Sequence, residues 1–291
     1  MKTKLLWINA LACNGNSHSF LNYEYLEQFF NNFEFIYHPI IDSNYSLKDI
    51  SNKYIQCDIL LIEGSISKNF KKADKSIEDI IEMYAPNVKK IITVGTCSSY
   101  GGIFKDSSYF NTTGLLFLEK KSSNKFQKYK NKTICISGCP IHPEVLVNTL
   151  YSVKNKINLS LDKFLRLKEY FAYSVHNGCT RNEYFEYKID NHNYGKLEGC
   201  MFYNHGCQGP YTSGSCNKIL SNGVNSKTRA GSQCNGCTEP SFPKSNLFFT
   251  KKNMGIPENL PFDVNKRAYL TLAGISKAFK IPRLEKGLFD D

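Results

Sequence analysis

The chain has 291 residues, 41% of them hydrophobic and 22% charged, which is enough for one large globular domain or two smaller ones. Its formal net charge is +11, but the lysines are scattered, apart from a concentration at residues 120–132 that we expect to be a solvated surface loop. No nucleic-acid-binding motif accompanies the charge, so we expect no nucleic-acid ligand. No apolar run approaches the ~20 residues that cross a bilayer. Residues 268–284 are interpreted as a short amphipathic segment.

The first half of the chain alternates short apolar runs with helical patterns. We predict strands at residues 4–11, 33–39, 58–64, 89–97 and 132–139, and helices at residues 20–30, 75–85 and 143–153. Strands that alternate with helices are typical of an α/β fold with a doubly wound parallel sheet.

Eleven cysteines are many for a chain of this size. No apolar signal segment and no arginine pair follow Met1, which favours a cytoplasmic location, either free or at the inner membrane through a partner. In a reducing compartment such cysteines bind metal more often than they form disulfides, and an odd number cannot all pair. We therefore expect metal centres.

Three cysteines follow predicted strands of the first region. Cys13, Cys97 and Cys139 stand in ACNGN, GTCSSYGG and SGCPIHP. Because ligands collect beyond the carboxyl ends of parallel strands, we expect these thiols to meet at one sheet edge. Cys57 and Cys135 instead lie before or within strands, and we interpret both as buried core residues.

After Tyr151 the alternation fades, and seven soft ligands follow between residues 176 and 237: His176, Cys179, Cys200, Cys207, Cys216, Cys234 and Cys237. Zinc would accept such ligands in groups of four. Seven ligands do not divide into two closed zinc tetrahedra, whereas one four-ligand and one three-ligand iron–sulfur cluster use all of them. The sequence therefore favours iron–sulfur clusters, with a zinc-stabilised interaction protein as the alternative.

An ordered series of motifs resembles the small subunit of [NiFe] hydrogenases from about residue 4 to residue 243. The motifs are ACNGN, IEGSI, VGTCSSYGG, SGCPIHPE, VHNGCTRNEYFE, GCQGPYTSGSC and SKTRAGSQCNGCTEP. The resemblance implies a flavodoxin-like domain at residues 1–158, followed by a loop-rich iron–sulfur domain at residues 159–291. It also implies a large-subunit partner that holds nickel and iron, because this chain lacks the two C-x-x-C pairs that such a centre needs.

The resemblance further implies three clusters and their ligands. Cys13, Cys97 and Cys139 match ligands of a proximal cluster, with Glu63 beside it. His176, Cys179, Cys200 and Cys207 match ligands of a distal [4Fe-4S] cluster, near which an unidentified redox acceptor would dock. Cys216, Cys234 and Cys237 match ligands of a medial cluster, [3Fe-4S] or [4Fe-4S].

One departure from the familiar family pattern concerns the proximal site. The chain has Cys13-Asn14-Gly15-Asn16 where C-x-x-C is usual, so either Asn16 or another oxygen donor completes a [4Fe-4S] cluster, or the cluster is [3Fe-4S]. With the absence of an export signal, this opening is similar to that of cytoplasmic, cyanobacterial-type uptake hydrogenases. A hydrogen-sensing regulatory hydrogenase is the alternative.

Overall fold

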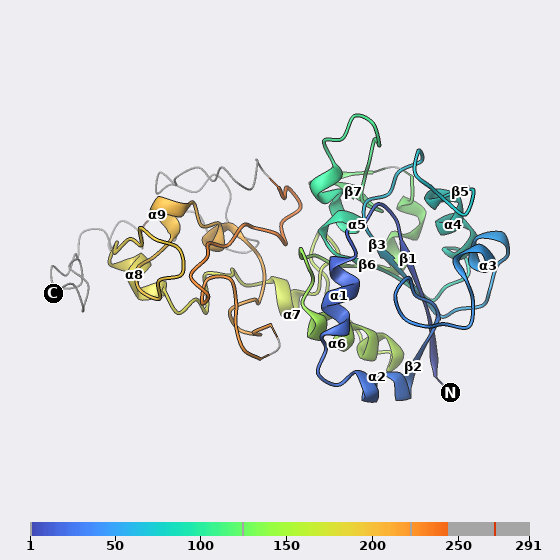
Figure 1. The fold of residues 1–291 in the computed structure, drawn as a ribbon, viewed down its shortest axis with the longest axis horizontal. Coiled ribbons are helices and arrows are strands. Elements are labelled where there is room, and N and C mark those ends of the chain that lie inside the picture. The colour runs from blue at the N-terminus through green and yellow to red at the C-terminus, as the bar shows by residue number, and fades with distance from the viewer. Residues whose placement is uncertain (1, 124, 222, 244–270, 272–291) are drawn as a thin grey trace. The chain divides into compact units, whose positions relative to one another are not determined.

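The computed structural model describes residues 2–123, 125–221 and 223–243, together with Thr271 (Figure 1). Two compact units divide the chain. Unit 1 comprises Met1–Lys168 and Thr238–Phe242, and unit 2 comprises Glu169–Cys237 and Pro243–Asp291. Residues 159–168, which we expected in the second domain, lie in unit 1; the division into two functional domains stays a prediction. The amphipathic segment expected at residues 268–284 lies outside the described residues, apart from Thr271.

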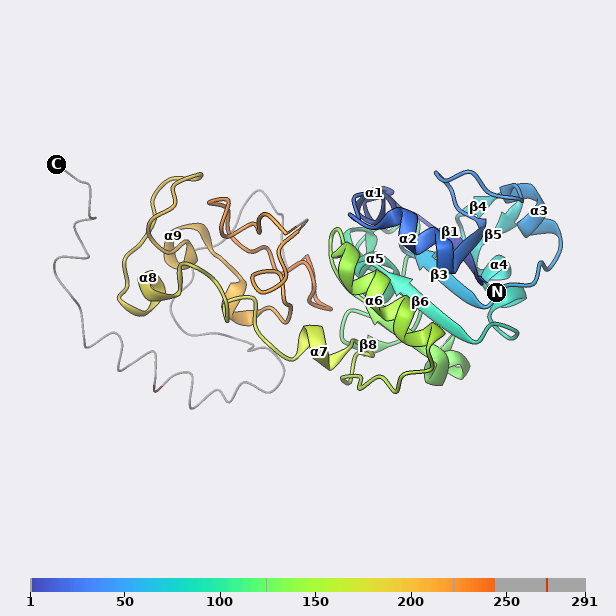
Figure 2. The same ribbon diagram turned by 90° about the horizontal axis from the view of Figure 1, so that it is seen from below.

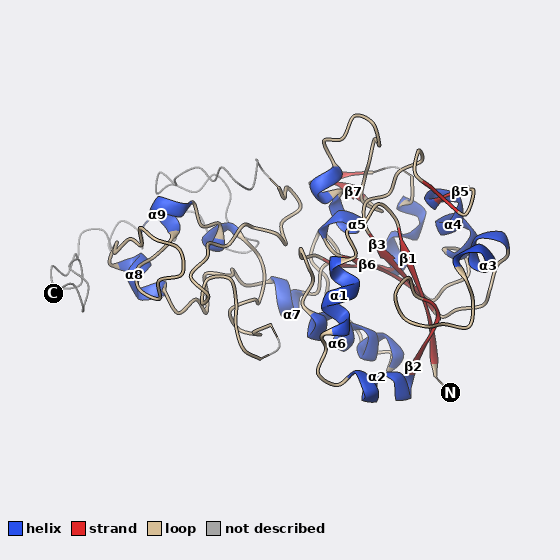
Figure 3. Cartoon of the chain, viewed as in Figure 1, coloured by secondary structure: helices blue, strands red, loops and turns tan. Residues whose placement is uncertain are grey.

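Unit 1 is built on a five-stranded sheet in the order β2-β1-β3-β6-β9, in which every neighbouring pair is parallel. The strands are β1 (Thr3–Asn9), β2 (Phe33–Tyr37), β3 (Ile59–Glu63), β6 (Lys90–Val94) and β9 (Thr133–Ile136) (Figure 3). All five residues of β3 are buried, as expected for a parallel strand that is covered on both faces. The predicted parallel α/β sheet is confirmed.

Six helices belong to the sheet layers: α1 (Gly15–Leu21), α2 (Leu26–Asn32), α3 (Leu47–Asn52), α4 (Ile77–Tyr84), α5 (Thr96–Tyr100) and α6 (Pro143–Lys154). Figure 1 shows the strands between α1 and α6 on one side and α3 and α4 on the other. α1 and α6 pack against each other. These layers leave the loops after β1, β6 and β9 at one edge of the sheet.

The single helix predicted at residues 20–30 is wrong. α1 begins at Gly15, directly after Asn14, whose backbone is left-handed with φ 61°. α1 ends before Asn22, and Tyr25, with φ −107° and ψ 43°, precedes α2. The apolar spacing across residues 20–30 concealed this break, because Phe20 and Phe29 are both buried although they belong to different helices.

Two short antiparallel strand pairs and two 3₁₀ helices complete unit 1. They are β4 (Lys71–Lys72) with β5 (Lys75–Ser76), β7 (Phe117–Leu118) with β8 (Lys121–Ser122), η1 (Gly102–Phe104) and η2 (Gln127–Lys132). The solvated loop predicted at residues 120–132 is partly wrong, since Phe126 is fully buried and the Tyr129 hydroxyl donates to Glu82 Oε2 at 2.8 Å. Here aromatic side chains attach a lysine-rich stretch to the core.

Unit 2 contains only short helices among its described residues: α7 (Lys168–Phe171, which begins at the last residue before the unit), α8 (Asn182–Glu186), α9 (Phe202–His205) and η3 (Gly209–Tyr211) (Figure 2). Two small buried clusters include cysteines. One contains Val175, Met201, Cys207 and Cys234, and the other contains Phe185, Cys200, Phe202 and Tyr211. Across the described part of the chain, no helix combines the length and apolar character that crossing a membrane requires.

Candidate metal centres

The sheet edge of unit 1 carries the three cysteines predicted there. Cys13 follows β1, Cys97 lies in the first turn of α5 after β6, and Cys139 follows β9. Burial raises the pKa of the Cys97 thiol, and the nearby Cys13 and Glu63 add to this effect. A side chain on Gly102, which has φ 54°, would come within 2.5 Å of Cys97 Sγ. The backbone therefore approaches this sulfur more closely than any other residue type would permit.

Asn16 connects two loops of this edge. Its Nδ2 donates to Val94 O at 3.2 Å, and its Oδ1 accepts from Ile141 N at 3.0 Å. Gly95, with φ 95°, makes room for it, since a Cβ there would lie 2.4 Å from Asn16 Nδ2. The Asn16 amide thus joins the end of β6 to the loop that contains Cys139. Its assignment as an iron ligand stays a prediction.

Glu63, at the end of β3, is fully buried and accepts hydrogen bonds from three residues. Its Oε1 accepts from Asn16 N at 2.9 Å and from Ser17 N at 3.4 Å. Its Oε2 accepts from Trp7 Nε1 at 3.1 Å and from Ser17 Oγ at 2.5 Å. A buried carboxylate is tolerated when it is hydrogen-bonded in this way. Glu63 therefore holds the start of α1, directly after Cys13, against the sheet.

Four predicted ligands of unit 2 line one cavity: His176, Cys179, Cys200 and Cys207. Backbone hydrogen bonds form the turns that present them, with Cys179 N donating to His176 O at 3.0 Å and Cys200 N donating to Ile189 O at 2.7 Å. Burial raises the pKa of Cys200 and of Cys207 to about 12, and burial lowers the pKa of His176 to about 4. Burial therefore disfavours the charged forms of Cys200, Cys207 and His176.

Cys216, Cys234 and Cys237 form the second group in unit 2. Burial raises the pKa of Cys216 to about 12, and Cys237 and Cys234 are close enough to raise it further. Cys234 N also donates to Cys207 Sγ at 3.3 Å, as does Gly209 N at 3.4 Å. The second group thus adjoins the first through a direct N–H···S contact.

The geometry bears on which metal would fit. Among residues 2–123, 125–221 and 223–243, no three Cys, His, Asp or Glu side chains converge on a point that could hold one metal ion. A closed zinc tetrahedron requires such convergence. The thiolates of an iron–sulfur cluster bind different irons, so they surround the cluster at greater spacing. The donor sets, thiols with one imidazole, have the chemistry of iron–sulfur cluster ligands.

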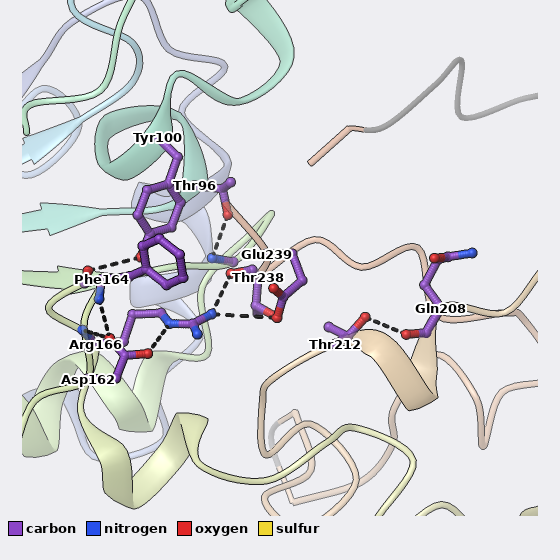
Figure 4. A network of polar contacts seen from close by, with 10 residues as sticks. Thr96, Tyr100, Asp162, Phe164, Arg166, Gln208, Thr212, Thr238 and Glu239 are labelled. Atoms are coloured by element: carbon purple, nitrogen blue, oxygen red, sulfur yellow. Dashed lines mark hydrogen bonds and ion pairs between the residues drawn. The ribbon is translucent and has the colours of Figure 1, made fainter. Parts of the chain in front are cut away.

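Sequence reasoning missed two buried arginines. Arg166, in unit 1, pairs with Asp162 Oδ2 at 2.8 Å and Glu239 Oε1 at 3.6 Å, and its Nη1 donates to Thr238 O at 3.2 Å (Figure 4). Arg166 thereby holds residues 238–242 in unit 1. Arg181, in unit 2, is 3% exposed. Arginines are mostly exposed, so the sequence offered only one signal, the position of Arg181 two residues after Cys179.

Comparison with known proteins identifies the family. Residues 13–153 match the family described as "NADH ubiquinone oxidoreductase, 20 Kd subunit", and residues 171–250 match the C-terminal family of the NiFe/NiFeSe hydrogenase small subunit. The chain is also 28% identical, over 305 aligned positions, to the F420 non-reducing hydrogenase II small subunit of Methanosarcina mazei, covering 88% of this chain and 78% of that protein. The chain belongs to the [NiFe] hydrogenase small-subunit family.

Other members of this family show similar sequence and fold. The periplasmic [NiFe] hydrogenase small subunit 1 of Nitratidesulfovibrio vulgaris is 33% identical over 194 residues, with 63% of this chain and 59% of that relative covered. The chain thus spans less than two thirds of that relative's length. The reduced, active form of the Ni-Fe-Se hydrogenase from Desulfomicrobium baculatum superposes with a TM-score of 0.73 at 25% identity, over 86% of this chain and all of the matched chain.

Proposed function

We propose that this chain is the electron-transferring subunit of a [NiFe] uptake hydrogenase. It would carry electrons from the nickel–iron centre of a large-subunit partner, through three iron–sulfur clusters, to an acceptor near His176. One observation carries the proposal: in a member of a hydrogenase small-subunit family, His176, Cys179, Cys200 and Cys207 line one cavity that adjoins a second cysteine group. Such donor sets are those that hold iron–sulfur clusters.

The residues that would hold each cluster follow from these groups. Cys13, Cys97 and Cys139 would bind the proximal cluster, with Asn16 as the candidate fourth ligand. Cys216, Cys234 and Cys237 would bind the medial cluster, and His176 with Cys179, Cys200 and Cys207 the distal one. Clusters bound at these positions would take up and release single electrons. The iron analysis described below also distinguishes three from four irons in the proximal and medial clusters.

The chain's own residues would shape each site in two ways. Burial disfavours free thiolates at Cys200, Cys207 and Cys234, so these sulfurs become anionic only when metal compensates their charge. Backbone N–H groups directed at Cys207 Sγ hydrogen-bond the sulfur and favour a more negative cluster. Loss of either feature would change how readily the site is loaded and reduced.

Hydrogen activation is assigned to the large subunit. The sequence contains a single C-x-x-C pair, Cys234 and Cys237, and our assignment uses it for the medial cluster. We propose a cytoplasmic location, free or at the inner membrane through a partner, and uptake rather than sensing. A sensor would pass its signal by protein contact, without sustained electron delivery.

The test is to purify the chain with the protein that co-elutes, and to measure iron, acid-labile sulfide and hydrogen-dependent dye reduction. We expect about ten to twelve irons per chain, depending on whether the proximal and medial clusters hold three or four irons each, and dye reduction only when the large subunit is present. Zinc without sulfide would contradict the proposal, and so would a monomer that reduces dye with hydrogen by itself. Hydrogen binding without sustained dye reduction would favour the sensor.

A further inference from the structure

Arg181 is a buried cation that, within the described part of the chain, donates its hydrogen bonds to backbone carbonyl oxygens. Its Nε donates to Thr228 O at 2.8 Å, and its Nη1 donates to Gly199 O at 2.7 Å and Glu198 O at 3.1 Å. Its Nη2 donates to Lys196 O. Three of these carbonyls lie in the turn that directly precedes Cys200. The guanidinium therefore holds the backbone of the turn that leads to Cys200, a predicted cluster ligand.

Among the described residues, the charge of Arg181 has no anionic side chain paired with it. In the described part of unit 2, no Asp or Glu oxygen lies within 4.0 Å of its guanidinium. Arg166, equally buried, has both Asp162 and Glu239. Carbonyl dipoles satisfy the N–H groups of Arg181, but they do not cancel its charge. A buried charge without a counterion is strongly unfavourable, so this position is suited to a neighbouring anion.

The anion that fits is a bound cluster. Arg181 lines the same cavity as His176, Cys179, Cys200 and Cys207, and the other walls include Val175, Phe185, Met201 and Phe202. Charges act strongly across such apolar surroundings because little water screens them. A cluster held by three thiolates and one neutral imidazole is anionic, and it becomes more so when reduced. A fixed positive charge therefore favours the reduced form.

We propose that Arg181 is the internal counter-charge of the distal cluster, raising its reduction potential, and that its hydrogen bonds position the turn before Cys200. The proposal rests on the proposed function, because it requires a cluster at the His176 site. Cys200 is also close to Asp190, whose negative charge acts on this sulfur in the opposite direction to the charge of Arg181.

Two variants separate charge from hydrogen bonding. R181Q removes the charge, whereas R181K keeps it but loses the forked set of donors. Lys196→Gln is the matched control, because it removes the same charge from an exposed side chain and leaves in place the Lys196 backbone carbonyl that accepts from Arg181. Each would be purified as the complex with its large subunit, and the clusters followed by paramagnetic resonance during a redox titration, with iron and sulfide content and thermal unfolding measured in parallel.

We expect R181Q to lower the midpoint potential of the distal cluster, and R181K to keep that potential while unfolding at a lower temperature. K196Q should match the unaltered protein. An unchanged potential in R181Q, or equal shifts in R181Q and R181K, would overturn the proposal. If R181Q does not retain the cluster, R181K becomes the test. A shifted midpoint potential in R181K would then overturn the proposal, and an unshifted one would support it. Absence of iron and sulfide from the unaltered complex would refute the proposed function instead.

Discussion

Replacing Glu63 with Gln should loosen the loop that follows Cys13. The substitution preserves an oxygen toward the N–H groups of Asn16 and Ser17, but it places an amide NH₂ where Oε2 accepts from Trp7 Nε1 and Ser17 Oγ. The Ser17 hydroxyl can rotate to accept instead. The indole N–H of Trp7 cannot, so it is left buried without an acceptor.

The expected loss is about 3 kcal/mol. Hydrogen bonds to charged groups contribute about 1.5–3 kcal/mol each, and a buried donor without a partner costs a similar amount. A loss of this size should speed hydrogen exchange at the Asn16 and Ser17 amides by about 100-fold, since about 1.4 kcal/mol corresponds to a factor of ten. Native-state hydrogen exchange read by mass spectrometry measures this locally, without requiring reversible unfolding.

A double-mutant cycle and a charge control complete the experiment. Trp7→Phe removes the indole donor, so the double variant W7F/E63Q should lose about 1 kcal/mol less than the sum of the single losses. Glu27→Gln changes the net charge equally at an exposed position of α2 and should leave exchange unchanged. Exchange in E63Q within threefold of the unaltered protein, or strict additivity in the cycle, would refute this account of Glu63.

Three further predictions concern single side chains. His176→Cys replaces a neutral ligand with a thiolate, so hydrogen-dependent dye reduction should fall while hydrogen–deuterium exchange by the complex persists; equal loss of both would indicate a structural role. Asn16→Cys should make the proximal cluster harder to reduce in a redox titration, whereas an unchanged potential would show that Asn16 only joins its two loops. Burial lowers the pKa of His38 from 6.5 to about 4. Between these pH values His38 therefore stays neutral in the native state but takes up a proton in the unfolded chain. The free energy of unfolding should fall by up to about 3 kcal/mol as the pH is lowered from 6.5 to 4. His38→Asn, which can still accept from Ile40 N and Ile41 N, should unfold at a temperature that changes less over this range.

The sequence predicted the sheet because its strands are short apolar runs that end at turn residues. Cys57 and Cys135 are buried at 5% and 1% exposure, as expected for thiols before or within such strands. Helix ends were harder to predict, because the break at residues 22–25 leaves the spacing of buried phenylalanines almost unchanged. Local pattern indicates which residues are buried, but it does not show whether one helix or two presents them.

The cysteines of the candidate sites could be predicted as ligands from their spacing and their chemistry. The roles of the residues around them could not be predicted in this way. The roles of Glu63 and Arg181 depend on hydrogen bonds to residues 15 or more positions away, such as Trp7 and Thr228. A charged residue in a sequence is most often at the surface, and only tertiary structure shows that these two are buried with several partners each.

The contacts of Arg166 also have a consequence for the order in which the chain can fold. Residues 169–237 leave unit 1 at Lys168 and return to it at Thr238, where Arg166 holds the backbone. They therefore form a closed loop of about 70 residues, whose ends lose about 4 kcal/mol of chain entropy when they meet. During synthesis this closure must wait until Thr238 and Glu239 have left the ribosome. By then every predicted cluster ligand has been made, so closure can follow metal loading, and R166Q should release the end of the loop without removing a ligand.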